Sequence, residues 1–100
     1  MPISVRAGDP AYVLVVWKNK GALPYAPIFR LDLRCSAFLS GWNEGERLQA
    51  SLAQPGETVT NQIYCVVPEG WEGDPGLDWK FHVIGIDAPV RSGSNGFAVL

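Results

Sequence analysis

Glycine and proline punctuate this chain at short intervals, and that punctuation limits the fold more than any other feature. The sequence has 11 Gly and 8 Pro in 100 residues. The runs between them are rich in Val, Ile, Leu, Phe, Trp and Thr, and none sustains the apolar period of a helix. Short strands separated by frequent turn signals predict an all-β sandwich or barrel.

The turn signals divide the chain into seven predicted strands. They cover residues 3–6, 12–18, 28–37, 47–52, 57–67, 77–87 and 96–100. At 100 residues, the chain is expected to form one domain, 1–100, which can bury a core of its own. We expect residues 88–95 to form a polar turn before the last strand.

Side-chain alternation predicts which residues of three strands face the core. The inward sets are Phe29, Leu31, Leu33 and Cys35, then Val59, Ile63, Cys65 and Val67, and finally Trp79, Phe81 and Val83. The outward sets include Arg30, Asp32, Arg34, Asp78, Lys80 and His82. Asn61 also falls on an inward face, where its amide needs hydrogen-bond partners.

Three segments of the chain match a known pattern of motifs. They are Trp17-Lys18-Asn19-Lys20-Gly21, Pro55-Gly56-Glu57-Thr58 and Val83-Ile84-Gly85-Ile86-Asp87. In these segments the sequence resembles the immunoglobulin-like β-sandwich of the bacterial CARDB type, and the resemblance covers nearly the whole chain. It implies a seven-stranded antiparallel immunoglobulin-like β-sandwich that serves binding, adhesion or spacing rather than catalysis.

The strand at residues 12–18 contains five consecutive apolar residues, VLVVW. The match at Asn19 and Gly21 places Val13, Val15 and Trp17 in the core. The apolar residues then left on the outer face of this strand and its neighbour are Tyr12, Leu14, Val16 and Tyr64. Contiguous exposed apolar surface usually marks an interface, so we predict a protein partner or self-association here. Alternatively, the N-terminal segment or residues 22–26 cover this face.

The two cysteines are predicted to approach each other in the immunoglobulin-like arrangement. There, the strands that carry Cys35 and Cys65 lie in opposite sheets and run in the same direction, and both side chains alternate inward. A disulfide between the sheets and a pair of buried thiols are both compatible with this placement. The outcome bears on compartment, because cytosolic proteins normally keep cysteines reduced.

In the same topology, two loops that contain aromatic residues emerge at one end of the sandwich. The candidate binding residues there are Phe38, Trp42, Asn43 and Trp71. Aromatic side chains on loops are frequent binding anchors, so we predict that this end contacts a partner. One alternative is that the rings fold back over the core. Another is a carbohydrate-binding module in which Trp42 and Trp71 stack on sugar rings.

The sequence offers little support for catalysis or metal binding. His82 is the only histidine, and no nucleophile can be placed within its reach, so we expect a solvated surface histidine and no enzyme. Four carboxylates cluster in sequence and could supply oxygen ligands to calcium, but they lack EF-hand spacing. They are Glu69, Glu72, Asp74 and Asp78. We expect a solvated acidic loop, without metal or cofactor.

Charge and hydropathy exclude further classes of function. A net charge of −2 gives no basic surface for nucleic acid, and no apolar run approaches membrane-spanning length. The first residues, MPISVRAGDP, lack the features of a signal peptide. We predict a non-catalytic structural or protein-binding component of a larger assembly. A phage virion accessory or decoration protein and a bacterial surface or adhesion domain both fit, which favours a virion or cell-surface location over the cytoplasm.

Overall fold

The computed structural model describes residues 3–36 and 41–100, and this part of the chain is all-β. Its strands are β1 (Ile3–Val5), β2 (Pro10–Lys18), β3 (Ile28–Arg34), β4 (Asn43–Glu44), β5 (Leu48–Gln49), β6 (Thr58–Val66), β7 (Asp78–Val83), β8 (Arg91–Gly93) and β9 (Phe97–Val99). Within the described ranges, no helix has the length and apolar character needed to cross a membrane.

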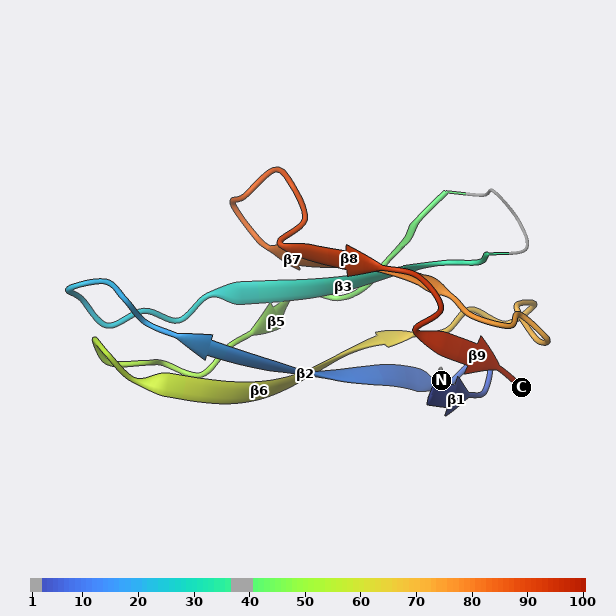
Figure 1. Cartoon of the computed structure of the whole chain (residues 1–100), viewed down its shortest axis with the longest axis horizontal. Coiled ribbons are helices and arrows are strands. Elements are labelled where there is room, and N and C mark those ends of the chain that lie inside the picture. Colours follow the sequence, from blue (N-terminus) through green and yellow to red (C-terminus); the bar gives the residue numbers. More distant parts are fainter. Residues whose placement is uncertain (1–2, 37–40) are drawn as a thin grey trace.

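The strands form three sheets. Strands β2 and β6 pair antiparallel along nine residues each, from Pro10 opposite Val66 to Lys18 opposite Thr58. We call this pair the β2–β6 ribbon. The largest sheet has the order β4-β3-β7-β8, and β5 also pairs with β3. Strand β1 pairs with β9 in parallel. Figure 1 shows the ribbon lying along one side of β3, β7 and β8, with β1 and β9 at the end where both termini lie.

The core lies between the ribbon and the largest sheet, as side-chain alternation predicts. Phe29, Leu31 and Leu33 of β3 are buried there. Ile63 and Cys65 of β6 are buried on the opposite side of the same cluster. The predicted inward faces of these two strands are therefore confirmed. By contrast, the inward residues of β2 are only partly buried, although they pack against the core: Val13, Val15 and Trp17.

The strand pattern differs from seven antiparallel strands. Of the predicted strand 47–52, only β5 is paired as a strand, and the loop before it contains β4. Strand β8 lies within the predicted turn 88–95, so the last strand is split into β8 and β9. The split occurs at Asn95, which has a positive φ of 59°. The Cα of Asn95 lies close to Gly76. A Cβ atom on residue 76 would be only 2.8 Å from that Cα, which explains why this residue is glycine.

Asn61 has the partners that its inward position requires. Nε1 of Trp17 donates a 2.8 Å hydrogen bond to Oδ1 of Asn61. Nδ2 of Asn61 donates a 2.9 Å hydrogen bond to Oγ of Ser51. The amide therefore joins both strands of the ribbon to the segment after β5.

Asn19 explains the Asn-x-Gly motif that ends β2. It is buried, and its Nδ2 donates to the carbonyls of Leu23 and Ala53 at 2.8 and 2.9 Å. Its Oδ1 accepts a hydrogen bond from the backbone N–H of Gly21. One side chain thus fixes the turn and ties it to the chain before β6.

Candidate functional site

The outer face of the ribbon carries the exposed apolar row that the sequence predicts. Tyr12, Leu14 and Val16 are 50%, 69% and 68% exposed. The connection at residues 22–26 does not cover them, because Leu23 and Tyr25 are themselves exposed. Across the ribbon Tyr64 faces Tyr12, and their ring centroids are 6.0 Å apart. The four predicted residues therefore share one surface, although Tyr64 is only half-exposed.

Tyr64 is held by the segment that follows β4. Its hydroxyl donates a 2.9 Å hydrogen bond to Oε2 of Glu46. This hydrogen bond raises the pKa of Tyr64 above its ordinary value, because the carboxylate favours the protonated phenol. The hydroxyl is therefore engaged within the domain, and it is the ring that faces Tyr12.

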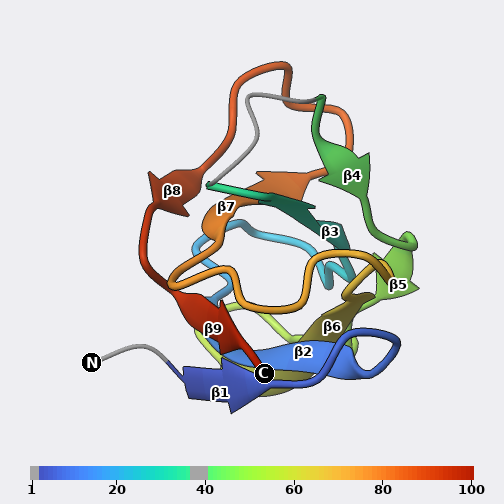
Figure 2. The same cartoon turned by 90° about the vertical axis from the view of Figure 1, so that its right-hand side faces the viewer.

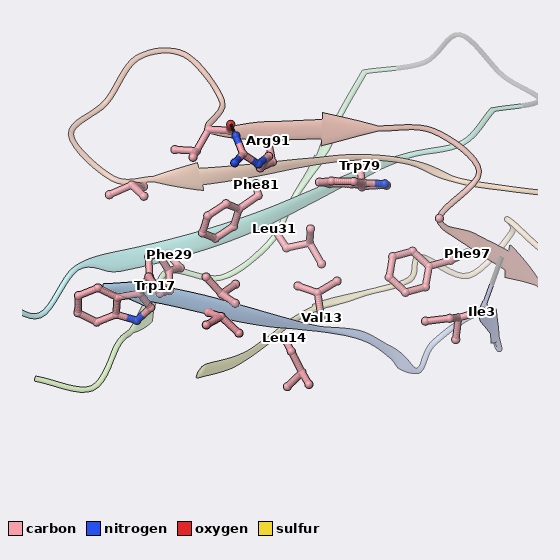
Figure 3. Close-up of a pocket in the computed structure, with 15 residues that line it drawn as sticks. Ile3, Val13, Leu14, Trp17, Phe29, Leu31, Trp79, Phe81, Arg91 and Phe97 are labelled. Atoms are coloured by element: carbon pink, nitrogen blue, oxygen red, sulfur yellow. Dashed lines mark hydrogen bonds between the residues drawn. The ribbon is translucent and has the colours of Figure 1, made fainter. Parts of the chain in front are cut away.

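An apolar cleft of about 530 Å³ opens between β2 and β8, on the inner side of the ribbon. This volume lies within the range of roughly 300–1,000 Å³ typical of ligand pockets. Figure 3 shows side chains from both sheets around it. The main lining side chains are Val13, Trp17, Phe29, Trp79, Phe81 and Phe97. Figure 2 shows β9 between the two sheets at the near end, with β1 below it beside β2.

The backbone of β2 forms one rim of this cleft. Leu14 borders the cleft although its side chain points away from it, so its main chain supplies the contact (Figure 3). Hydrogen bonds at both ends of the ribbon fix the pattern: the carbonyl of Asp9 accepts from Val67, and the N–H of Asn19 donates to Glu57. Backbone groups alternate between the two sides of a strand. Hence odd-numbered residues of β2 face β6, and even-numbered ones face the opposite edge.

That opposite edge of β2 has no neighbouring strand among the described residues. Its backbone N–H and C=O groups belong to the even-numbered residues Tyr12, Leu14, Val16 and Lys18. The sequence reasoning missed the cleft, because it placed Val13, Val15 and Trp17 in a closed core. The signal that could have revealed it is the apolar run itself, which has apolar side chains on both faces of one strand.

The outer face of the largest sheet is polar, and part of it is buried. Asp32 is 2% exposed and accepts two hydrogen bonds from Arg30, at 2.8 and 2.9 Å. The backbone N–H of Gly45 donates to the same carboxylate at 3.3 Å. The hydrogen bond to Asp32 raises the pKa of Arg30, although burial opposes this effect. The ion pair is therefore enclosed by the chain that follows β4.

His82 is not the solvated histidine that the sequence predicts. It is 9% exposed, and its Nε2 lies 3.2 Å from Oδ2 of Asp32, in a geometry that does not make a hydrogen bond. Alternation places it correctly on the outer face, but this part of the face, beside Asp32, is itself buried. In the described part of the chain, Nε2 of His82 has no hydrogen-bond partner.

The two loop tryptophans occupy different environments. Trp42 lies beneath two cations, with Cζ of Arg34 and Nζ of Lys80 at 4.5 and 4.0 Å from its ring centroid. Such cation–π contacts place the ring on the outer face of β3 and β7. Trp71 packs against the core. Both rings are half-buried, and the hollow that Trp42 borders between β7 and the chain around β8 is not lined by Trp71.

The other two residues of the predicted loop end separate as well. Asn43 pairs with Leu33 in the sheet and so faces inward, where its Nδ2 donates to the carbonyl of Val66 at 3.3 Å. It connects the largest sheet to the ribbon. Phe38 lies outside the described residues.

The two cysteines are buried thiols, and no disulfide joins them. Sγ of Cys35 donates a 2.8 Å hydrogen bond to Oδ2 of Asp74. Cys65 lies beside Asn43, whose Nδ2 is 3.4 Å from Sγ. Burial raises the pKa of Cys65 to about 11. Of the two arrangements that the sequence leaves open, the structure has the reduced one.

The four clustered carboxylates have separate roles. Asp74 is buried and also accepts hydrogen bonds from Ser36 and from the backbone of Gly76. Asp78 forms an ion pair with Arg34 at 2.8 Å. Among the described residues, no three His, Cys, Asp or Glu side chains converge in a geometry that could hold a metal ion. The expectation of a solvated acidic loop is therefore wrong for Asp74, which is 4% exposed.

Comparison with known proteins adds no family to these observations. No protein-family model matches the chain, and no curated protein is significantly similar to it.

Proposed function

We propose that this chain is a non-catalytic protein-binding module with an immunoglobulin-like sandwich fold. The pairing of β2 with β6, of β3 with β7 and of β7 with β8 supports this fold. These pairings correspond to the B–E and C–F–G neighbours of an immunoglobulin domain. The split strand and the parallel β1–β9 pair are then local variations on that topology. The sequence motifs of the CARDB type support a role in adhesion or spacing.

One observation carries the proposed binding role, namely the exposure of Leu14 and Val16 on the ribbon. Two large aliphatic side chains remain about two-thirds exposed beside Tyr12. Burying a Leu or Val side chain contributes roughly 1.5–3 kcal/mol, so covering this row with a partner is favourable. Tyrosine is also among the residues enriched at binding hot spots. The assembly that this surface would join is a virion or a bacterial surface structure.

A carbohydrate-binding role has less support. Arg34 and Lys80 lie over the ring of Trp42, in the space that a stacked sugar would need. Trp71 packs against the core instead of presenting its ring. We therefore favour a protein partner over a sugar.

A pair of matched double variants tests the proposed surface. Leu14→Lys with Val16→Glu places charges in the apolar row. The control, Ser92→Lys with Ser94→Glu, makes the same charge changes on exposed polar residues of β8 and the turn after it, away from the ribbon. Circular dichroism would establish that both variants fold. Sedimentation and quantitative co-purification from the source cells would measure self-association and partner recovery.

We expect the apolar-row variant to lose self-association or partner recovery by about tenfold or more, equivalent to roughly 1.4 kcal/mol. The control should behave like the unmodified protein. Unchanged association of the folded apolar-row variant, with every partner recovered in full, would show that this face is not the interface.

A further inference from the structure

We propose that the cleft between β2 and β8 accepts an extended segment of a partner protein, which adds to the ribbon as a third strand along the open edge of β2. This inference rests on the proposed protein-binding function and names the form of the partner. It concerns the inner side and edge of the ribbon, whereas the apolar row lies on the outer face. The two contacts can therefore be tested separately.

The open edge of β2 presents a regular row of backbone groups. The backbone N–H and C=O groups of the odd-numbered residues of β2 bond to β6. The backbone groups of Leu14 and Val16 therefore point toward the cleft side. Adding a strand to such an edge is a recurrent form of peptide recognition, in which main-chain hydrogen bonds supply affinity. An apolar small molecule in the cleft would leave these N–H and C=O groups without protein partners.

The cleft supplies the side-chain component of the same recognition. Side chains of an added strand alternate, so every second one would enter the cleft between the sheets. The walls that they would meet are apolar and partly aromatic, as with Trp17 and Phe81. The segment that fits therefore has apolar residues at alternate positions.

Strand β2 also lacks the features by which proteins protect an open edge. Natural edge strands are short, or carry proline, bulges or inward-pointing charges. Strand β2 is nine residues long, and the stretch from Ala11 to Trp17 has neither proline nor charge. The facing edge, β8, is only three residues long and carries Arg91. Of the two rims, β2 is the one suited to pairing.

Arg91 indicates a charge on the bound segment. It pairs with Phe81 in register and so faces the cleft. Its guanidinium donates to the carbonyl of Val90 at 3.3 Å, and the described residues offer it no ion pair. A carboxylate on the segment would complement it. The occupant is thus an extended peptide with alternating apolar residues and an acidic residue near β8.

A synthetic peptide provides a direct probe. It has nine residues, like β2, with valine and threonine alternating and one aspartate near an end. A control peptide has the same composition with its valines adjacent, and another carries N-methyl groups on the amides that would face β2. Amide hydrogen exchange of the intact chain, followed by NMR, reports which backbone groups become protected.

We expect the alternating peptide to slow exchange at Leu14 and Val16 by about tenfold or more. Val13 and Val15, which already face β6, should change little. The two control peptides should bind at least about tenfold more weakly. Equal protection of even- and odd-numbered residues of β2 would overturn the proposal. Binding of an apolar dye in the cleft without binding of the peptide would overturn it as well. Protection that rises with protein concentration alone would show that a second copy occupies the edge.

Variants at one position separate the edge from the outer face. Val16→Pro removes an N–H from the open edge while leaving the bonds to β6 intact, and such a position tolerates proline. Val16→Lys changes the outer side chain but keeps the N–H. We expect the proline variant to lose peptide binding by about tenfold and the lysine variant to retain it. Equal binding by both folded variants would contradict the proposal.

A charge exchange at Arg91 keeps the proposal testable if the proline variant does not fold. Arg91 is exposed, so Arg91→Glu should not disturb folding. This variant should bind the aspartate peptide several-fold more weakly, and a peptide with lysine in place of aspartate more tightly. Identical binding of both peptides to both proteins would contradict the assigned occupant. In one outcome, the unmodified protein does not bind the peptide, while the variant Leu14→Lys with Val16→Glu still has weaker association. That result would refute the peptide site and leave the proposed protein-binding function standing.

Discussion

Nε1 of Trp17 donates a 2.8 Å hydrogen bond to Oδ1 of Asn61, across the two strands of the ribbon. Trp17 lines the apolar cleft, and Asn61 is bonded in turn to Ser51. The polar edge of the indole is thereby satisfied, while its ring remains part of the cleft wall. The contact therefore fixes an aromatic side chain at the proposed peptide site.

Replacing Asn61 with leucine is expected to destabilise the domain by about 1–3 kcal/mol. The indole N–H of Trp17 would lose its partner in a partly buried position, and such a group carries a penalty of this size. Chemical denaturation, monitored by circular dichroism, measures the change. Gln62→Leu is the control, because Gln62 is exposed on the opposite face of the same strand. It should change stability by no more than about 0.5 kcal/mol. Equal effects of both substitutions would show that the Asn61 hydrogen bonds do not stabilise the fold.

The Arg30–Asp32 and Arg34–Asp78 ion pairs of the largest sheet should differ in their effect on stability. The side chains of Arg30 and Asp32 are 18% and 3% exposed, against 33% and 19% for Arg34 and Asp78. Asp32→Ala removes a buried carboxylate that accepts hydrogen bonds from Arg30 and Gly45, and leaves Arg30 only its 3.8 Å contact with Glu44, which should cost about 1–3 kcal/mol. Asp78→Ala should cost about 0–1 kcal/mol, because water screens the more exposed pair. Urea denaturation of both variants checks this order, and a larger loss for Asp78→Ala would contradict it.

The contact between Tyr64 and Glu46 predicts a shift in titration. The hydrogen bond raises the pKa of Tyr64, so its phenol should ionise at a higher pH than an ordinary tyrosine. Glu46→Gln removes the charge and should lower the pKa of Tyr64 toward its ordinary value. NMR titration of the tyrosine ring signals measures both changes. An unchanged Tyr64 titration in Glu46→Gln would show that the carboxylate does not act on this hydroxyl.

Alternation predicted the inward faces of β3 and β6 because both strands are buried by a facing sheet along their length. The exposed row at Leu14 and Val16 was identified by the motif match at Asn19 and Gly21, which set the register of the all-apolar run. The cleft was not predictable in this way, since alternation tells which face a side chain occupies and not whether another strand closes over it. That closure depends on the split at Asn95, which ends β8 after three residues.

The burial of His82 escaped prediction for a related reason. Its position on the outer face follows from alternation, but alternation does not show that the sheet extends past its neighbour Asp32 by a strand of only two residues, β4. A strand so short has no pattern of its own in the sequence. Its pairing with Asp32 and Leu33 is determined by tertiary contacts instead.

Both cysteines are expected to be reduced and unreactive in the folded protein. Burial raises the pKa of Cys65 from 9.0 to about 11, which lowers its thiolate fraction near pH 8 by roughly a hundredfold. Alkylation without reductant should be slow in the native state. In denaturant, it should add two groups per chain, as measured by intact mass. A denatured chain that accepts none, but accepts two after reduction, would establish a Cys35–Cys65 disulfide.

The same shift predicts how stability depends on pH. Between about pH 9 and 11, the Cys65 thiol ionises in the unfolded chain but stays protonated in the folded one. The unfolded state then binds fewer protons, so the free energy of unfolding should fall as pH rises through this window. Urea denaturation at a series of pH values measures the slope, and Cys65→Ala should reduce it. An equal slope in that variant would assign the alkaline loss of stability to other groups, such as the tyrosines.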